Sequence, residues 1–158
     1  MIFIDTQIWV FSRKSPDRKR FSDPSKYNLF LDLHNQALEF LTKAIEKNVI
    51  CMTFHQLLEI FHSFAFRGRK EIIQDAKKFC SELLSSKFIH WYSITETQVS
   101  ECLNLSAQSN IHIWDYICIV PLIDDVDVLY SCDSHFQDAT FSQFKKPILN
   151  PLNKWILI

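Results

Sequence analysis

The first six residues, Met1-Ile2-Phe3-Ile4-Asp5-Thr6, form a short apolar run that ends in an acid and a hydroxyl residue. Comparable apolar runs recur along the chain, and longer stretches with helical periodicity separate them. Nearly continuous apolar runs are typical of strands in a parallel sheet whose two faces are covered by helices. The alternation therefore predicts an α/β fold, with a parallel β-sheet of about five strands flanked by helices on both faces.

The same patterns give bounds for the elements. The expected strands are Met1–Asp5, Val49–Met52, Phe88–Ile94, Val126–Cys132 and Trp155–Ile158. The expected helices are Tyr27–Lys47, Phe54–Phe66, Lys70–Leu84, Thr95–Ser109 and Ile113–Ile123. Thr53 stands where an N-cap belongs, and Thr95 with Gln98 has the spacing of a capping box. Ser12–Lys26, with two prolines, is expected to be an exposed loop between the first strand and the first helix.

The composition fits a single domain over residues 1–158 and excludes several classes of site. Lysine and arginine number 17 against 18 acids, so the charge of the whole chain gives no argument for nucleic-acid binding. The single glycine, Gly68, excludes glycine-rich nucleotide loops and a GxSxG elbow. Five cysteines without a CxxC pair favour a reducing cytoplasm, and no apolar run predicts a signal peptide or a membrane span.

Acidic residues follow several of the expected strands. Asp5 ends the first strand, Asp133 follows the fourth, and Glu59 lies in the helix after the second. The carboxyl ends of parallel strands meet at one edge of the sheet, which is where ligands bind in such folds. Clustered carboxylates repel one another unless a cation or bound protons relieve the repulsion. Mg²⁺ and Mn²⁺ take oxygen ligands of this kind and support phosphodiester hydrolysis.

Four segments resemble the motifs of the PIN-domain family, which includes the VapC-type toxins of toxin–antitoxin pairs. Met1–Thr6 resembles its apolar strand ending in Asp-Thr, and Thr53–Glu59 resembles its hydroxyl residue followed by a helical glutamate. Ile113–Ile119 is similar to the stretch usually seen as Asp-Ala-Leu-Ile-Ala, and Leu129–Phe136 is similar to its strand, hydroxyl, acid and Phe. The order and approximate spacing hold along nearly the whole chain.

The resemblance implies a PIN-like sandwich that cleaves single-stranded RNA with a divalent metal ion. It implies that four acids hold Mg²⁺ or Mn²⁺ and carry catalysis, namely Asp5, Glu59, Asp115 and Asp133. It also implies that the hydroxyls of Thr6 and Ser131 orient these carboxylates. The expected partners are single-stranded RNA, a small antitoxin protein and a second copy of the chain in a homodimer.

Each acid also has a purely structural interpretation. Asp5 could terminate a strand, Glu59 could be an exposed helix residue, and Asp115 could be an N-cap. Asp133 could be a turn residue after a strand, and Asp138 is expected at the surface. It is the register of the four motifs together that favours the metal interpretation.

Some neighbouring residues depart from the family pattern or suggest other ligands. Gln7 and Tyr116 stand where the family has smaller residues, so both are expected to add bulk beside the site. His55, Glu59 and His62 share one helix face. A di-iron bundle would need a second Glu-x-x-His string, which the sequence lacks, so both histidines are interpreted as packing or surface residues.

Basic residues offer a route to RNA that the net charge does not. Arg18, Lys19 and Arg20 lie in the expected loop near Asp5 and are candidates for phosphate contacts, although a solvated loop explains them equally well. A second basic patch is formed by Arg67, Arg69 and Lys70.

Two other functions compete with the ribonuclease. A PIN fold without useful catalysis could serve as an RNA- or protein-binding scaffold, and the bulk of Gln7 and Tyr116 is compatible with it. A haloacid-dehalogenase-type phosphatase would need Asp-x-Asp after the first strand, where this chain has Asp5-Thr6-Gln7. The sequence therefore favours the nuclease.

Overall fold

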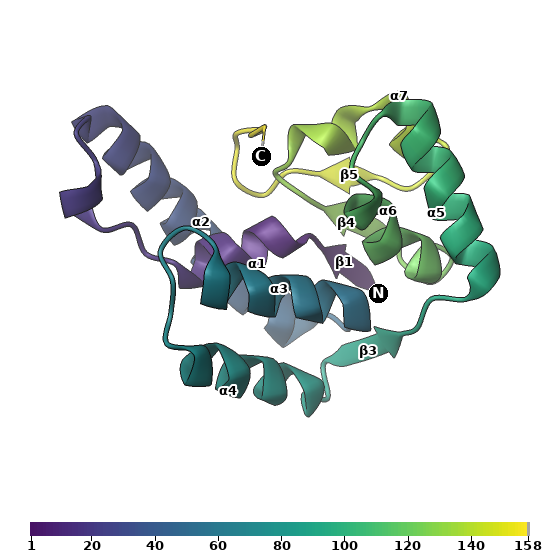
Figure 1. Ribbon diagram of the computed structural model, residues 1–158, viewed down its shortest axis with the longest axis horizontal. Coiled ribbons are helices and arrows are strands. Elements are labelled where there is room, and N and C mark those ends of the chain that lie inside the picture. Colours follow the sequence, from purple (N-terminus) through teal and green to yellow (C-terminus); the bar gives the residue numbers. More distant parts are fainter. Residues whose placement is uncertain (158) are drawn as a thin grey trace.

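A five-stranded parallel sheet with the order β3-β2-β1-β4-β5 forms the centre of the computed structural model, which describes residues 1–157 (Figure 1). The strands are β1 (Ile2–Ile4), β2 (Ile50–Thr53), β3 (Ile89–Tyr92), β4 (Val128–Tyr130) and β5 (Ile148–Leu149). All four neighbouring pairs are parallel. The strand order places β1 in the middle, with β2 and β4 on either side.

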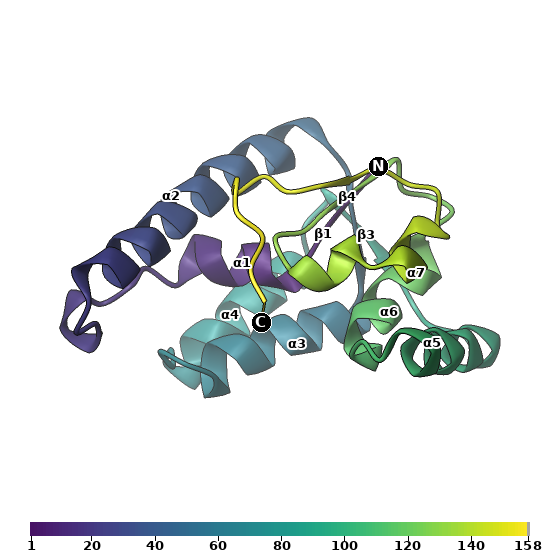
Figure 2. The same ribbon diagram turned by 90° about the horizontal axis from the view of Figure 1, so that it is seen from above.

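Helices surround this sheet in the described part of the chain. The α-helices are α1 (Thr6–Arg13), α2 (Pro24–Lys47), α3 (Phe54–Phe66), α4 (Ile73–Leu84), α5 (Glu96–Ser109), α6 (Ile113–Ile119) and α7 (Ala139–Ser142). Short 3-10 helices lie between these elements, namely η1 (Arg18–Arg20), η2 (Val120–Leu122) and η3 (Ser134–Gln137). In Figure 2, α2 lies on one side of the strands and α5 and α6 lie on the other.

Alternate residues of β1 supply the two hydrophobic cores. Ile2 and Ile4 pack into a core with α1 and α2, whereas Phe3 packs into a second core with α5 and α6. Successive side chains of a strand point to opposite faces, so an apolar strand buried on both faces is what this packing requires. The predicted fold class, a parallel sheet with helices on both faces, is confirmed.

Two of the predicted helix starts are confirmed by their caps. The Thr53 hydroxyl accepts a hydrogen bond from the Gln56 amide at 3.0 Å, and α3 has the predicted bounds. Thr95 and Gln98 form the capping box that opens α5. The start of α2 lies at Pro24, earlier than predicted, because the Asp23 side chain accepts from the Ser25 amide and proline suits the first helical position.

The first connection was predicted wrongly. Helix α1 begins directly after Asp5, and η1 interrupts the segment Ser12–Lys26 that was expected to be loop throughout. The helix buries Ile8, Trp9 and Phe11 against the first core. The residues of α1 form a short run rich in β-branched and aromatic side chains. Such a run cannot be assigned to a helix or a strand from its periodicity alone, so the helix was not predicted.

The last strand was also predicted wrongly. β5 is Ile148–Leu149, which pairs with β4, whereas the predicted strand Trp155–Ile158 makes a single bridge between Ile156 and Asp133 within the described residues. Ile158 lies outside them. Prolines on both sides, Pro147 and Pro151, restrict β5 to two residues, too few to give a pattern in the sequence.

Three further findings concern a helix boundary, the cysteines and membrane spans. The predicted helix Ile113–Ile123 divides into α6 and η2, because Pro121 cannot continue the α-helical hydrogen bonds. All five cysteines are buried and free. Within residues 1–157, no helix combines the length and apolarity that a membrane crossing requires.

Candidate active site

The four acids that the sequence singled out lie in one pocket at the carboxyl edge of the sheet. Asp5 follows β1, Asp133 follows β4, Glu59 comes from α3 and Asp115 from α6. The pocket has a volume of about 180 Å³. Its other lining residues are Thr6, Gln7, Ser63, Arg67, His112, Trp114 and His135. The topology thus brings together residues that are up to 128 positions apart, from Asp5 to Asp133, in the chain.

Two buried hydroxyls fix the acids on β1 and α3. The Thr6 hydroxyl donates to Glu59 Oε2 at 2.6 Å, and the Ser131 hydroxyl donates to Asp5 Oδ2 at 2.9 Å. Ser131 also accepts from the Asp133 amide at 3.0 Å, so one side chain positions two acids. Thr6 and Ser131 therefore make the contacts with carboxylates that a supporting role requires.

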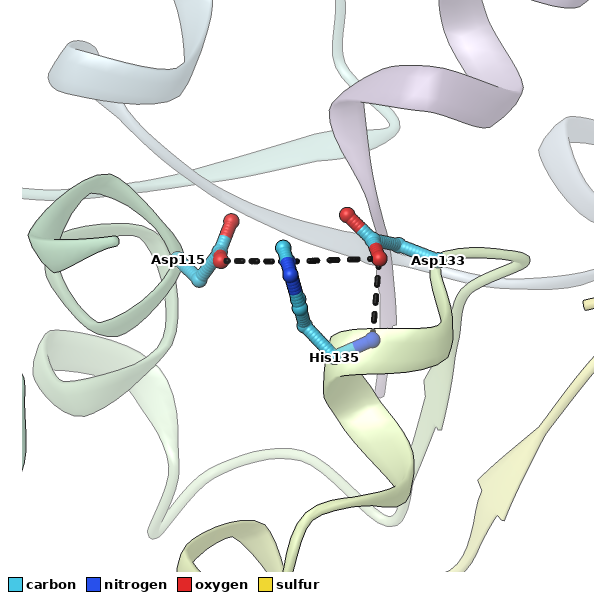
Figure 3. A group of neighbouring side chains, drawn as sticks. All are labelled: Asp115, Asp133 and His135. Atoms are coloured by element: carbon cyan, nitrogen blue, oxygen red, sulfur yellow. Dashed lines mark hydrogen bonds and ion pairs between the residues drawn. The ribbon is translucent and has the colours of Figure 1, made fainter. Parts of the chain in front are cut away.

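The remaining two acids meet a histidine that the sequence analysis missed. Figure 3 shows the imidazole of His135 between the carboxylates of Asp115 and Asp133. Its Nδ1 lies 3.7 Å from Asp115 Oδ2 and 3.4 Å from Asp133 Oδ1. One ligand atom from each residue lies within 4.8 Å of the others, a spacing that suits a shared cation. The available signal was weak: a histidine two positions after an acid is common without any shared site.

Burial and mutual repulsion strongly perturb the carboxyl groups. Burial, reinforced by Asp115 and Glu59, raises the pKa of Asp5 well above its usual value. Burial, reinforced by Asp133 and Glu59, raises the pKa of Asp115 to about 7. These two carboxyls therefore ionise less readily than exposed aspartates unless positive charge is brought beside them.

The donor set fits a hard divalent cation. The Oδ2 atom of Asp115 is buried and accepts no hydrogen bond, although the His135 Nδ1 lies 3.7 Å away, so its hydrogen-bonding capacity is left unused inside the pocket. Four carboxylates supply oxygen ligands of the kind that Mg²⁺ and Mn²⁺ bind, and His135 adds a nitrogen that Mn²⁺ accepts more readily than Mg²⁺.

The structural interpretations of the acids have different outcomes. Asp115 is not an N-cap, because His112 occupies that position and Asp115 lies in the first turn of α6. Asp133 does cap η3, since its Oδ1 accepts from the His135 amide at 2.9 Å, and it lines the pocket as well. Asp138 instead caps α7 through the Thr140 amide.

Of the two bulky residues, only one is at the pocket. Gln7 lines it, whereas the Tyr116 ring is fully buried and stacks on Phe141. The Tyr116 hydroxyl bonds to Ser109 and Thr140, so the expectation that Tyr116 adds bulk beside the site is wrong. On a helix, the residue after Asp115 points to a different face, and here that face is the core.

The histidines of α3 lie beside the pocket. His55 stacks on Trp114, with ring centroids 4.6 Å apart, and burial lowers the pKa of His55. His62 contacts Phe66 at a centroid distance of 5.5 Å. Neither side chain lines the acid pocket, in keeping with their interpretation as packing or surface residues.

The three basic residues of η1 are exposed and differ in their surroundings. Arg18 donates to the Phe21 carbonyl at 2.7 Å and lies over the Tyr27 ring. Arg20 lines a groove of about 520 Å³, which shares Gln7, Ser63 and Arg67 with the acid pocket. Lys19 lines neither. From the second basic patch, Arg67 reaches the acid pocket itself.

The sheet order, the helices on both faces and the acids at the carboxyl edge define a PIN-domain, VapC-like fold. No protein-family model matches the sequence, and no curated protein matches it. Solved structures do match, at sequence identities low enough that the likeness concerns the fold alone.

Three of these structures cover nearly the whole chain. VapC20 of Mycobacterium tuberculosis, a toxin that cleaves the sarcin–ricin loop, is 14% identical with a TM-score of 0.64, over 87% of this chain and 93% of its own. FitAB bound to the IR36 DNA fragment is 11% identical with a TM-score of 0.54, over 97% and 96%. VapBC2 of Rickettsia felis, bound to a DNA fragment from its promoter, is 13% identical with a TM-score of 0.55, over 95% and 98%.

Proposed function

We propose that this chain is a metal-dependent endoribonuclease that hydrolyses phosphodiester bonds in single-stranded RNA. The observation that carries the proposal is the convergence of four carboxylates, from four different elements, on one pocket of a PIN-like fold. Buried acids that repel one another destabilise a protein unless they serve a ligand, and burial together with this repulsion raises the pKa of Asp5 and of Asp115.

In this proposal the pocket residues have three roles: holding the cation, positioning its ligands and binding the substrate phosphate. Asp5, Glu59, Asp115 and Asp133 hold Mg²⁺ or Mn²⁺, and Thr6 and Ser131 keep two of these carboxylates in place. The divalent cation supplies Lewis acidity toward a phosphodiester when it is bound. Arg67, on the pocket wall, adds a positive charge for the substrate phosphate.

The biological role that the fold likeness supports is that of a toxin with a small antitoxin partner. The structures with a similar fold include VapC20, a toxin, and the VapBC2 and FitAB assemblies. An antitoxin segment that enters the acid pocket would block the substrate phosphate. A homodimer and a cytoplasmic location belong to the same proposal.

The decisive experiment is cleavage of a panel of single-stranded RNAs with Mg²⁺ or Mn²⁺, with an EDTA control. Asp5→Asn tests the pocket, and Asp32→Asn is the matched control, since Asp32 is exposed on α2 and bonds to Gln36. We expect metal-dependent cleavage by the wild type and Asp32→Asn, and none by Asp5→Asn. Equal cleavage by all three would identify a contaminant and would remove the support for this site.

The toxin role has a separate test in growing bacteria. Expression of the wild type should arrest growth, expression of Asp5→Asn should not, and both proteins should accumulate equally. Growth arrest by both variants would place the toxicity outside the acid pocket. RNA binding without cleavage by the wild type would favour the scaffold function instead.

A further inference from the structure

A partly exposed tryptophan borders the acid pocket and has no role in holding a cation. Trp114 lies on α6 immediately before Asp115, and 42% of its surface is exposed. Four aromatic side chains in the described residues are exposed to a similar degree, namely Phe30, Phe54, Phe66 and Trp114. Among these, Trp114 alone lines the acid pocket. Its exposure therefore needs an explanation that belongs to the site.

The indole ring is supported from behind. His55 of α3 stacks flat against it, with centroids 4.6 Å apart and ring planes 12° apart. His112 also stacks on the indole, at a centroid distance of 6.2 Å and a ring-plane angle of 29°, and 42% of the Trp114 surface still remains exposed. A large aromatic ring held by stacking loses little conformational entropy when a flat ligand covers its free surface.

We propose that Trp114, backed by His55, is a stacking platform for a nucleobase next to the cleaved phosphodiester. This inference rests on the proposed function, because it takes single-stranded RNA as the substrate. Aromatic side chains stack on unpaired bases in single-stranded RNA, at about 1–3 kcal/mol per base. Trp114 adjoins Asp115 in sequence and shares its pocket, so a nucleotide with its phosphate at the acids has this ring beside it.

A structural role for Trp114 makes a different prediction. If the ring merely covered α3, its loss would lower stability without changing how the protein responds to individual bases. The test must therefore vary the base and the tryptophan together. A double-mutant cycle isolates the contact between them from any general loss of stability.

The experiment measures RNA binding in the Asp5→Asn background, where cleavage cannot interfere. A short single-stranded RNA is scanned with an abasic nucleoside at each position in turn. We expect one position at which base removal weakens binding by about 5- to 150-fold, the range that about 1–3 kcal/mol implies. In Asp5→Asn/Trp114→Ala the same replacement should change binding by less than about twofold.

Two further variants keep the result interpretable. Trp114→Phe retains an aromatic surface and should retain part of the abasic effect. Phe54→Ala removes an exposed aromatic that stacks on Trp91 at 5.2 Å, outside the acid pocket, and should retain all of it. Thermal unfolding of each variant shows whether it remains folded.

The outcomes separate this inference from the nuclease itself. If the wild type cleaves RNA but Trp114→Ala leaves the abasic profile unchanged, the platform is overturned and the nuclease stands. If the wild type does not cleave, yet binding shows an abasic effect that depends on Trp114, the platform stands and the nuclease fails. Absence of both cleavage and an abasic effect overturns both.

Discussion

The acid pocket and a larger hollow of the molecule differ in how their charged groups are paired. That hollow lies between α1 and α4, has a volume of about 680 Å³, and contains both cations and acids. Arg13 donates to Glu71 at 2.9 Å, and the Lys14 ammonium donates to the carbonyls of Ser63 and Arg67. The acid pocket is much smaller, at about 180 Å³, and gathers four carboxylates with few cations.

The difference teaches that charge balance identifies a functional site better than size does. In the α1–α4 hollow Arg13 pairs with Glu71, and Lys14 and Arg69 donate to backbone carbonyls, so these contacts are explained by folding alone. In the acid pocket the Asp115 carboxylate keeps an oxygen without a hydrogen-bond partner, and burial, reinforced by neighbouring acids, raises its pKa. Such an arrangement is stable only when something outside the chain relieves it.

The largest expected effect comes from removing one acid of the acid pocket, with the matching change in the α1–α4 hollow as its control. Glu59→Gln removes a carboxylate of the acid pocket and should lower RNA cleavage by at least about 100-fold, because even indirect supports of metal ligands contribute 10- to 100-fold. Glu71→Gln changes the same chemical group in the α1–α4 hollow and should leave cleavage within about twofold. Initial rates with Mn²⁺ measure both. Comparable losses in the two variants would erase the distinction between the regions.

The second prediction concerns stability without metal. The pKa of Asp115 rises from 3.8 to about 7 on folding, so the folded state holds a proton that the unfolded chain releases. The stabilisation from this group is fully present below pH 3.8 and is lost as the pH rises through about 7. In EDTA, the free energy of unfolding should therefore fall between about pH 4 and pH 7.

Asp115→Asn should flatten that pH dependence and stabilise the metal-free protein at about pH 8 by roughly 1–3 kcal/mol. Saturating Mn²⁺ should stabilise the wild type by about 2.7 kcal/mol at a hundredfold excess over Kd, and the variant far less. Denaturant unfolding in EDTA and in Mn²⁺ measures both effects. A wild type whose stability rises over this pH range would contradict the proposed repulsion.

How far the sequence predicts the fold follows from how each element is stabilised. Local signals were sufficient for α3 and α5, whose threonine caps lie in the sequence next to the helices they open. They failed for α1, whose residues have strand-like character and become helical only because Ile8 and Trp9 are buried against α2. They failed again for β5, because a strand of only two residues carries no period.

The site shows the same division between local and tertiary information. The convergence of the four acids on one pocket could be predicted because each acid lies within a recognisable motif. His135 and Trp114 could not, because their importance depends on contacts from other elements: Asp115 beside His135, and His55 beneath Trp114. Tyr116 was misjudged because neighbouring helix positions point in different directions. The positions of His135, Trp114 and Tyr116 all depend on how α6 is oriented against α3 and η3.

The third prediction tests whether positive charge near the groove contributes to binding. Replacing Arg18, Lys19 and Arg20 together by Gln should weaken RNA binding by about tenfold and reduce the salt slope by up to about 2, at roughly 0.7 per phosphate contact on single strands. The intrinsic catalytic rate at saturating RNA should not change. Affinity measured at several salt concentrations provides the check. An unchanged affinity and salt slope would show that η1 is only a solvated turn.

The smallest expected effect is the stability change caused by Glu71→Gln. The Arg13–Glu71 pair is partly exposed, with side chains 32% and 19% accessible, and Arg13 also lies over the Phe79 ring at 4.5 Å. That ring contact survives the substitution, so the loss should be at most about 1 kcal/mol, or about 2–4 °C in Tm, and less at high salt. A loss of several kcal/mol would mean that the stability of the α1–α4 hollow depends strongly on the Arg13–Glu71 ion pair. A small loss would confirm that its charges are already balanced within the chain.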